Sequence, residues 1–345
     1  MSGAATPPAP LDRPGPDTPG PARARPSDPA QLFDLARGGA DGDRRALARL
    51  LSLVERGGTP ARDLARLTAP VAGGAYSIGL TGAPGAGKST LTGRLLGHLL
   101  QHDAGPVAVL AVDPTSPLSG GAILGDRVRM QDFALERGVF IRSMATRGHL
   151  GGLAAAVPDA VRLLDAAGWP TVLVETVGVG QVEVEVAGTC DTVVVVLNPG
   201  WGDAVQANKA GLLEVADVLV INKADRPGVR ETRRDLVHML QLSGQLAWTP
   251  PIVETVASSG DGISDLAEAI GSHREFLERE GGLEARRARR KAEEAERLAT
   301  DRFAREVAAE LRGSGALDAF AAGTLEPPEA SDRIVEAVAR KLAGG

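Results

Sequence analysis

A run of small residues and one lysine at positions 82–89 has the composition and spacing of a phosphate-binding loop. The run consists of Gly82, Ala83, Pro84, Gly85, Ala86, Gly87, Lys88 and Ser89, and it fits the pattern G-x-x-x-x-G-K-S. Glycines allow consecutive backbone N–H groups to surround phosphate oxygens, and the helix expected after Gly87 directs its positive end at the same anion. Lys88 would reach the β- and γ-phosphates, and the hydroxyl of Ser89 would bind Mg²⁺. Because an apolar run precedes the motif and a helical pattern follows it, we predict a nucleoside triphosphate site.

A second motif, formed by Asn222, Lys223, Ala224 and Asp225, ends an apolar run and matches the guanine-reading pattern N-K-x-D. The Asp225 carboxylate can accept hydrogen bonds from the ring N–H and the exocyclic amine of guanine, whereas adenine has no donors at those positions. Two charge-assisted bonds of about 1.5–3 kcal/mol each favour guanine by roughly 10²–10⁴-fold. Lys223 would lay its stem on the base, and Asn222 would tie the base-binding loops together. We therefore predict GTP rather than ATP, with Ala257 and Ser258 supplying backbone contacts to the guanine carbonyl.

Three carboxylates are candidates for the metal and switch positions. Asp113 and Glu175 each end an apolar run, where the sheets of α/β proteins place ligand-contacting residues, and Asp126 lies in a glycine-rich segment. Glu175 begins a stretch with the spacing of a D-x-x-G switch, so the N–H of Gly178 could sense the γ-phosphate. Aspartates at strand ends are also common helix caps and turn formers, and for Asp126 this alternative stays fully open.

The residue that would accelerate hydrolysis is not evident from the pattern. Gln181, Arg127 and Arg142 are candidates for the water-orienting glutamine or the arginine finger. GTPases without an arginine finger turn over at about 10⁻⁴ s⁻¹, and a supplied finger accelerates them by about 10³–10⁵. We therefore expect slow intrinsic hydrolysis that a partner stimulates.

Seven apolar runs alternate with helical patterns through the middle of the chain. The expected strands are Tyr76–Leu80, Val107–Val112, Val139–Ile141, Thr171–Glu175, Thr192–Leu197, Val218–Asn222 and Ile252–Thr255. Helical patterns follow Gly87 and occupy about 127–136, 153–167, 203–216, 229–242 and 262–272. The apolar runs are continuous rather than alternating, which indicates strands buried on both faces. We predict an α/β fold: a three-layer P-loop NTPase domain with a mostly parallel sheet, flanked by N- and C-terminal helical extensions.

Four segments follow from this pattern. Residues 1–29 contain nine prolines and are expected to be a disordered tail, and the alternative of a transit peptide is disfavoured by those prolines and the aspartates. Residues 30–70 should form a helical layer, and 71–272 the nucleotide-binding domain. Residues 273–345 are charged and helical, and we expect an arm that needs a partner surface.

Composition excludes several classes of protein. A chain of 345 residues with 43% apolar composition can bury a large core without staples, and a single cysteine rules out a disulfide framework or a thiolate zinc site. A net charge of −6 argues against a general nucleic-acid binder. The apolar runs are too short to span a bilayer, and the N-terminus lacks an apolar signal core, so we expect a cytoplasmic protein without membrane contact.

With these motifs assembled, the chain resembles the MeaB/ArgK/MMAA family of G3E-type P-loop GTPases. The matching stretches are TGAPGAGKSTL, AVDPTSPLSGGAILGDRVRM, VETVGVGQ and NKAD, and the resemblance covers about 31–312. It implies a homodimer with a C-terminal dimerisation arm. It also implies a chaperone that gates cofactor loading of an adenosylcobalamin-dependent acyl-CoA mutase, chiefly methylmalonyl-CoA mutase, and protects or reactivates that enzyme.

The resemblance also carries over individual sites. It adds Thr90 to the phosphate loop, assigns Asp113, Asp126 and Glu175 to Mg²⁺, and implies a partner switch over Asn198–Gly211. The polar residues of that switch are Asp203, Gln206 and Lys209. Trp201 departs from the Thr/Ala-rich start of this segment in the family, which bears on the identity of the partner rather than on the nucleotide chemistry.

Two other functions remain open on the residues alone. A nickel metallochaperone GTPase would share the nucleotide motifs, but such proteins usually carry histidine-rich tracts or paired cysteines, whereas this chain has five scattered histidines and one cysteine. A kinase linked to amino-acid transport would need an ATP donor, against which Asp225 argues.

Overall fold

The computed structural model describes residues 28–102, 105–114, 133, 136–146, 152–176, 188–200, 215–242, 244, 246–279 and 281–343. The expected helices at 127–136 and 203–216 fall largely outside these residues, as does nearly all of the proline-rich segment 1–29. Among the described residues, no helix combines the length and apolarity needed to cross a bilayer.

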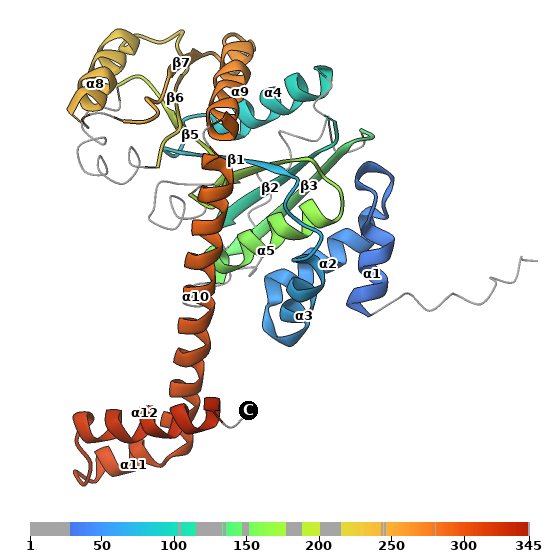
Figure 1. Ribbon diagram of the computed structural model, residues 1–345. Helices are drawn as coiled ribbons and strands as arrows, with labels where there is room; N and C mark the ends of the chain where they lie inside the picture. The colour runs from blue at the N-terminus through green and yellow to red at the C-terminus, as the bar shows by residue number, and fades with distance from the viewer. Residues whose placement is uncertain are drawn as a thin grey trace, which may run out of the picture.

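A seven-stranded sheet forms the centre of the molecule (Figure 1). Its strands are β1 (Tyr76–Gly82), β2 (Val107–Pro114), β3 (Val139–Thr146), β4 (Thr171–Thr176), β5 (Thr192–Leu197), β6 (Val218–Asn222) and β7 (Ile252–Thr255), in the order β3-β2-β4-β1-β5-β6-β7. Every pairing between these strands is parallel. The predicted α/β class is therefore confirmed, and all seven strands begin at the predicted residue.

Side chains of the central strands alternate between two apolar layers. On β5, Val194 and Val196 pack with the core beneath α4 (Lys88–Gln101) and α9 (Ile263–Arg279), whereas Val193 and Val195 pack toward α8 (Val229–Leu242) on the other face. Both sets are fully buried. Burial on both faces explains why the strands read as continuous apolar runs.

The N-terminal layer consists of α1 (Pro29–Ala36), a 3₁₀ turn (Gly39–Asp41), α2 (Arg44–Arg56) and α3 (Gly58–Thr68). Asp28 and Asp43 cap α1 and α2 by accepting backbone N–H bonds. Leucines of α2 share a core with α5 (Gly152–Ala166) and with Trp169 just before β4. This layer therefore covers the face of the sheet opposite α4.

The helix expected at 262–272, α9, extends to Arg279, and the C-terminal arm follows it. The arm consists of α10 (Gly282–Gly313), which passes the sheet and projects away from it, and of α11 (Ala316–Ala321) and α12 (Pro327–Ala343) at its far end (Figure 1). Lys341 of α12 pairs with Glu310 of α10 at 2.6 Å, and an apolar cluster that includes Leu325 and Ala330 lies between the helices.

Arginines of α10 hold this helix to the amino-terminal edge of the sheet. Arg287 and Arg290 pair with Asp191, which precedes β5 and is 2% exposed. Arg286 binds both oxygens of Asp217, which precedes β6, at 2.9 and 2.8 Å. The first half of the arm is thus fixed to the starts of β5 and β6, and the other end of β6 leads to the Asn222–Asp225 motif.

Candidate functional site

The phosphate loop follows β1 at the carboxyl edge of the sheet and leads into α4. Gly82 has φ 142° and Gly87 has φ 95°, both in the region that favours glycine. A Cβ at Gly82 would overlap the backbone of Val196, and one at Gly87 would overlap the Asn222 amide. These two glycines are therefore required by local geometry as well as by the path of the loop.

Lys88 lies inside the loop rather than in solvent, with 6% of its surface exposed. Its Nζ donates to the carbonyl oxygens of Gly82 at 2.7 Å and Ala83 at 3.0 Å. The ammonium group is thereby held among the backbone groups at the start of α4, where the helix dipole favours an anion. A buried cation in this position suits an anionic ligand such as a phosphate.

Ser89 and Glu175 bring a hydroxyl and a carboxylate together beside the loop. Ser89 Oγ donates to Glu175 Oε1 at 2.5 Å, and Glu175 is 1% exposed. The pairing is set by the sheet, because β1 and β4 lie side by side with Leu80 opposite Glu175. Hard oxygen donors of this kind are what Mg²⁺ prefers.

Asp113 lies at the same edge of the sheet. The β2–β4 register places Ala111 opposite Glu175, so Asp113 extends two residues further along β2. Only the backbone of Asp113 is described. Asp126 and Gly178 lie outside the described residues.

Asn222 connects three loops from a buried position. Its amide Nδ2 donates to the carbonyl of Ala86 at 2.7 Å, and its Oδ1 accepts bonds from Thr255 Oγ1 at 3.1 Å and from Ala257 N–H at 3.0 Å. The residue is 1% exposed. The predicted link between base-binding loops therefore has a concrete form: one side chain joins the phosphate loop, the end of β6 and the segment after β7.

Lys223 and Asp225 follow Asn222 in a turn. Lys223 has φ 60°, the left-handed conformation, and its Nζ donates to Gly85 O at 2.5 Å. The turn is closed by Arg226 N–H donating to Lys223 O at 3.0 Å, and Ala224 N–H ties it to the end of β7 by donating to Thr255 O at 3.0 Å. Asp225 is exposed, so its carboxylate is accessible for a base beside the Lys223 stem.

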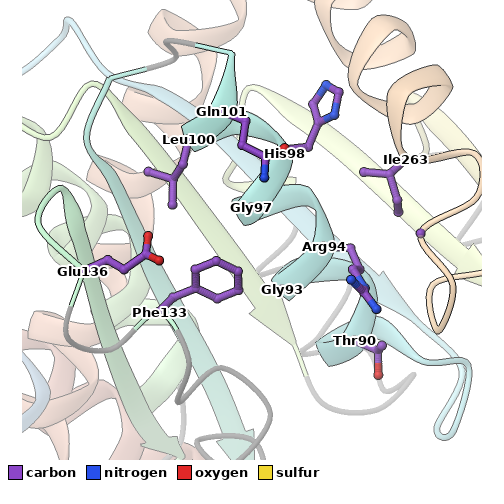
Figure 2. Close-up of a pocket in the computed structure, with 11 residues that line it drawn as sticks. Thr90, Gly93, Arg94, Gly97, His98, Leu100, Gln101, Phe133, Glu136 and Ile263 are labelled. Carbon is purple, nitrogen blue, oxygen red and sulfur yellow. The ribbon is translucent and has the colours of Figure 1, made fainter.

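One contact at this edge was not predicted. Arg94, on α4, donates from Nε to Ala257 O at 3.1 Å and from Nη2 to Ser258 O at 2.7 Å. It also lines a cavity of about 860 Å³ along α4 together with Thr90, His98 and Phe133 (Figure 2). No motif includes this arginine, so only the fold reveals its position.

The candidates for accelerating hydrolysis are not brought to the phosphate loop by the described structure. Arg142 of β3 bonds Ser52 and Glu55 of α2, both at 2.9 Å, so it is engaged with the N-terminal layer. Gln181 and Arg127 lie outside the described residues, as do the partner-switch residues Asp203, Gln206 and Lys209.

Comparison with known proteins agrees with this geometry. Residues 47–312 match the family described as methylmalonyl Co-A mutase-associated GTPase MeaB. A putative GTPase of Pyrococcus abyssi is 51% identical over 275 residues, which are 79% of this chain and 85% of that protein. The Mus musculus protein described as methylmalonic aciduria type A homolog, mitochondrial, is 34% identical over 285 residues, or 76% of this chain and 68% of that protein.

A solved structure described as a LAO/AO transport system kinase is also similar. It superposes with a TM-score of 0.64 at 25% identity, covering 92% of this chain and 99% of that chain. The predicted resemblance is confirmed by these matches. Because the family match spans most of the chain and includes both nucleotide motifs, the chain belongs to the methylmalonyl-CoA mutase-associated GTPase MeaB family and is a guanine-nucleotide-binding GTPase.

Proposed function

We propose that this GTPase is a chaperone of an adenosylcobalamin-dependent acyl-CoA mutase, with methylmalonyl-CoA mutase as its client. In this role, GTP binding and hydrolysis gate cofactor loading and protect or reactivate the mutase. The family match over residues 47–312 is the observation that carries the proposal, since the family is described by its association with that mutase. The mouse relative is named a methylmalonic aciduria type A homolog, and this name supports the same client.

The nucleotide is held by groups whose positions are described above. Lys88 and backbone N–H groups of the loop from Gly85 to Thr90 bind the phosphates, and Asp225 binds the guanine edge. Asn222 keeps the phosphate loop and the base-binding loops in register, because it is bonded to both. Positioning and electrostatic stabilisation account for most of the catalysis of phosphoryl transfer.

Mg²⁺ suits the donors at this edge. Ser89 and Glu175 form a pair of oxygen donors in contact, and Asp113 lies near the carboxyl end of β2, on the other side of β4 from β1. These three residues would hold the ion, with Asp126 as the fourth candidate. When bound, Mg²⁺ neutralises charge that develops on the β- and γ-phosphate oxygens.

Hydrolysis is slow without the partner in this proposal. Arg142 is bonded to Glu55 of α2, so it does not serve as the arginine finger. The partner switch, with Asp203, Gln206 and Lys209, follows β5 directly and is the segment through which the client would stimulate turnover. The C-terminal arm forms the homodimer, and the protein acts in the cytoplasm.

The test combines capture with kinetics. The full chain, loaded with Mg²⁺ and a non-hydrolysable GTP analogue, is used to capture partners from a lysate of the source organism, with GDP and an ATP analogue as matched loads. Recovery of a B12-dependent acyl-CoA mutase only with the GTP analogue is expected. Single-turnover GTP hydrolysis should then rise by about 10³–10⁵ when the captured mutase is added.

Three outcomes would contradict the proposal. Hydrolysis that is fast without any partner would exclude the gated role. ATP binding as tight as GTP binding would favour the kinase alternative. Purification with stoichiometric nickel would favour the metallochaperone alternative.

A further inference from the structure

Arg94 connects the helix that begins at the phosphate loop to the loop that follows β7. Its Nε and Nη2 form one side of the planar guanidinium, and each donates to a different carbonyl, Ala257 O at 3.1 Å and Ser258 O at 2.7 Å. Figure 2 shows the side chain extending from α4. Two parallel donors in a rigid plane fix the direction of both carbonyl groups, which a flexible point charge would not do.

The loop is held from the opposite side by Asn222. Ala257 N–H donates to Asn222 Oδ1 at 3.0 Å, and Ala257 is 3% exposed. Ser259 N–H and Gly260 N–H both donate to Val256 O, which closes the turn. The peptide between Ala257 and Ser258 is therefore fixed by contacts on either side of it.

The direction of one N–H group follows from this arrangement. A trans peptide is planar, so its C=O and N–H point in opposite directions. Since Ala257 O is directed at Arg94, the N–H of Ser258 is directed away from Arg94, and Ser258 is exposed. Within the described part of the chain, that N–H has no acceptor.

We propose that Arg94 is a positioning residue for guanine recognition: it orients the Ala257–Ser258 peptide so that the N–H of Ser258 meets the O6 carbonyl of guanine. The inference rests on the proposed base-binding role of this loop and adds to it the residue that sets its geometry. Arg94 itself contacts no base. Its contribution appears only with nucleotides that carry the O6 carbonyl.

Two simpler roles give different results. If Arg94 only attracted phosphates through its charge, a lysine would replace it, and the base would not matter. If it only stabilised the fold, its removal would lower the thermal midpoint and weaken every nucleotide equally.

The experiment measures Mg²⁺-dependent binding of two nucleotides by calorimetry: GDP, and the diphosphate of 2-aminopurine riboside, which lacks O6 and the ring N–H. Each variant is compared with the wild type on the same nucleotide, so the weaker contact of this probe with Asp225 is common to both chains. The variants are Arg94→Ala, Arg94→Lys and the control Gln101→Ala, which lies on the same helix and lines the same cavity. Arg94→Ala should weaken GDP binding about five- to tenfold, as expected for one lost hydrogen bond, and leave the 2-aminopurine nucleotide unchanged. Arg94→Lys should recover little of the loss, and Gln101→Ala should match the wild type with both nucleotides.

Equal weakening of both nucleotides by Arg94→Ala, full recovery by Arg94→Lys, or no effect on GDP would each overturn the inference while leaving the proposed function intact. Should Arg94→Ala unfold, Arg94→Lys tests the inference instead, because it should weaken the binding of GDP and leave the binding of the 2-aminopurine nucleotide unchanged. A wild-type chain that binds neither GDP nor GTP would overturn the proposed function together with the inference.

Discussion

The two edges of the central sheet differ in the contacts that their charged side chains make. At the amino-terminal edge, the carboxylates of Asp191 and Asp217 are paired with arginines of α10 within the same chain. At the carboxyl-terminal edge, Lys88 is held by carbonyl oxygens of its own loop, at the start of a helix suited to an external anion. One edge of the sheet therefore satisfies its charges within the chain, whereas the other holds the residues of the proposed nucleotide site.

The contacts at the amino-terminal edge also shift the pKa values of two of its residues. Burial alone would raise the pKa of Asp191, but hydrogen bonds and positive charge from Arg287 and Arg290 outweigh it and hold the pKa below its usual value. His273 behaves differently: burial lowers its pKa, and nearby Arg286 adds to that effect, while Asp217 and Asp191 oppose it. Near pH 7, the Asp191 carboxylate is therefore ionised and the His273 imidazole is neutral.

The largest effect should come from Asp191→Ala. Breaking a buried ion pair by removing one partner typically costs about 3–5 kcal/mol. We expect the lower end, because Arg287 keeps the carbonyls of Gly73 and Ala75 and Arg290 keeps that of Thr189. Denaturant unfolding checks the loss.

Arg289→Ala is the matched control for this prediction, since its pair with Glu293 on α10 is exposed and should contribute little. The folded Asp191→Ala chain should bind GDP with an affinity within about twofold of the wild type, because the substitution lies far from the proposed nucleotide site. An Asp191→Ala chain as stable as Arg289→Ala would refute the role assigned to the amino-terminal edge.

Asp225→Asn should give the opposite result at the carboxyl-terminal edge. The amide loses one acceptor for guanine, so GDP binding should weaken about 10²-fold, with little change in unfolding because the residue is exposed. Xanthosine diphosphate has a carbonyl in place of the exocyclic amine, and its binding should strengthen.

Calorimetry with both nucleotides measures this exchange, and Asp235→Asn, an exposed carboxylate on α8, is the control. If GDP and xanthosine diphosphate both weakened equally, Asp225 would not be reading the base.

The smallest effect concerns His273. Because its folded pKa lies below the unfolded value of 6.5, the unfolded chain binds the extra proton first as the pH falls. Its contribution to stability is therefore complete above pH 6.5 and is lost as the pH falls toward the folded pKa. His273→Gln should flatten this part of a plot of thermal midpoint against pH, whereas exposed His238→Gln should not. An unchanged slope in His273→Gln would assign the pH dependence to other groups.

Features set by local spacing could be predicted from the sequence. Continuous apolar runs marked β5 and β6 at their observed residues, and the glycine spacing marked the phosphate loop before α4. The α/β class, the family and the GTPase activity were predicted and are confirmed. The helix expected at 262–272 is longer than predicted, because Gly271 does not end it and α9 continues to Arg279.

Features set by the meeting of distant segments could not be predicted. Arg94 reaches residues 257 and 258 across the end of the sheet, and nothing in its local sequence distinguishes it from a solvent-exposed helix arginine. The arginines of α10 give no sign in the sequence of which carboxylates they contact. Arg286, Arg287 and Arg290 pair with Asp191 and Asp217, which lie about 70–100 residues earlier and become their neighbours only through the parallel crossovers.

The close approach of position 87 to the amide of Asn222 has a consequence for how this site can change over time. Any side chain at 87 would displace that amide, and the disturbance would pass to Thr255 and Ala257, which depend on the same asparagine. In the proposed site, phosphate binding and base selectivity are therefore coupled through Asn222. During evolution, the phosphate loop and the Asn222–Asp225 motif would therefore have to change together or both be kept.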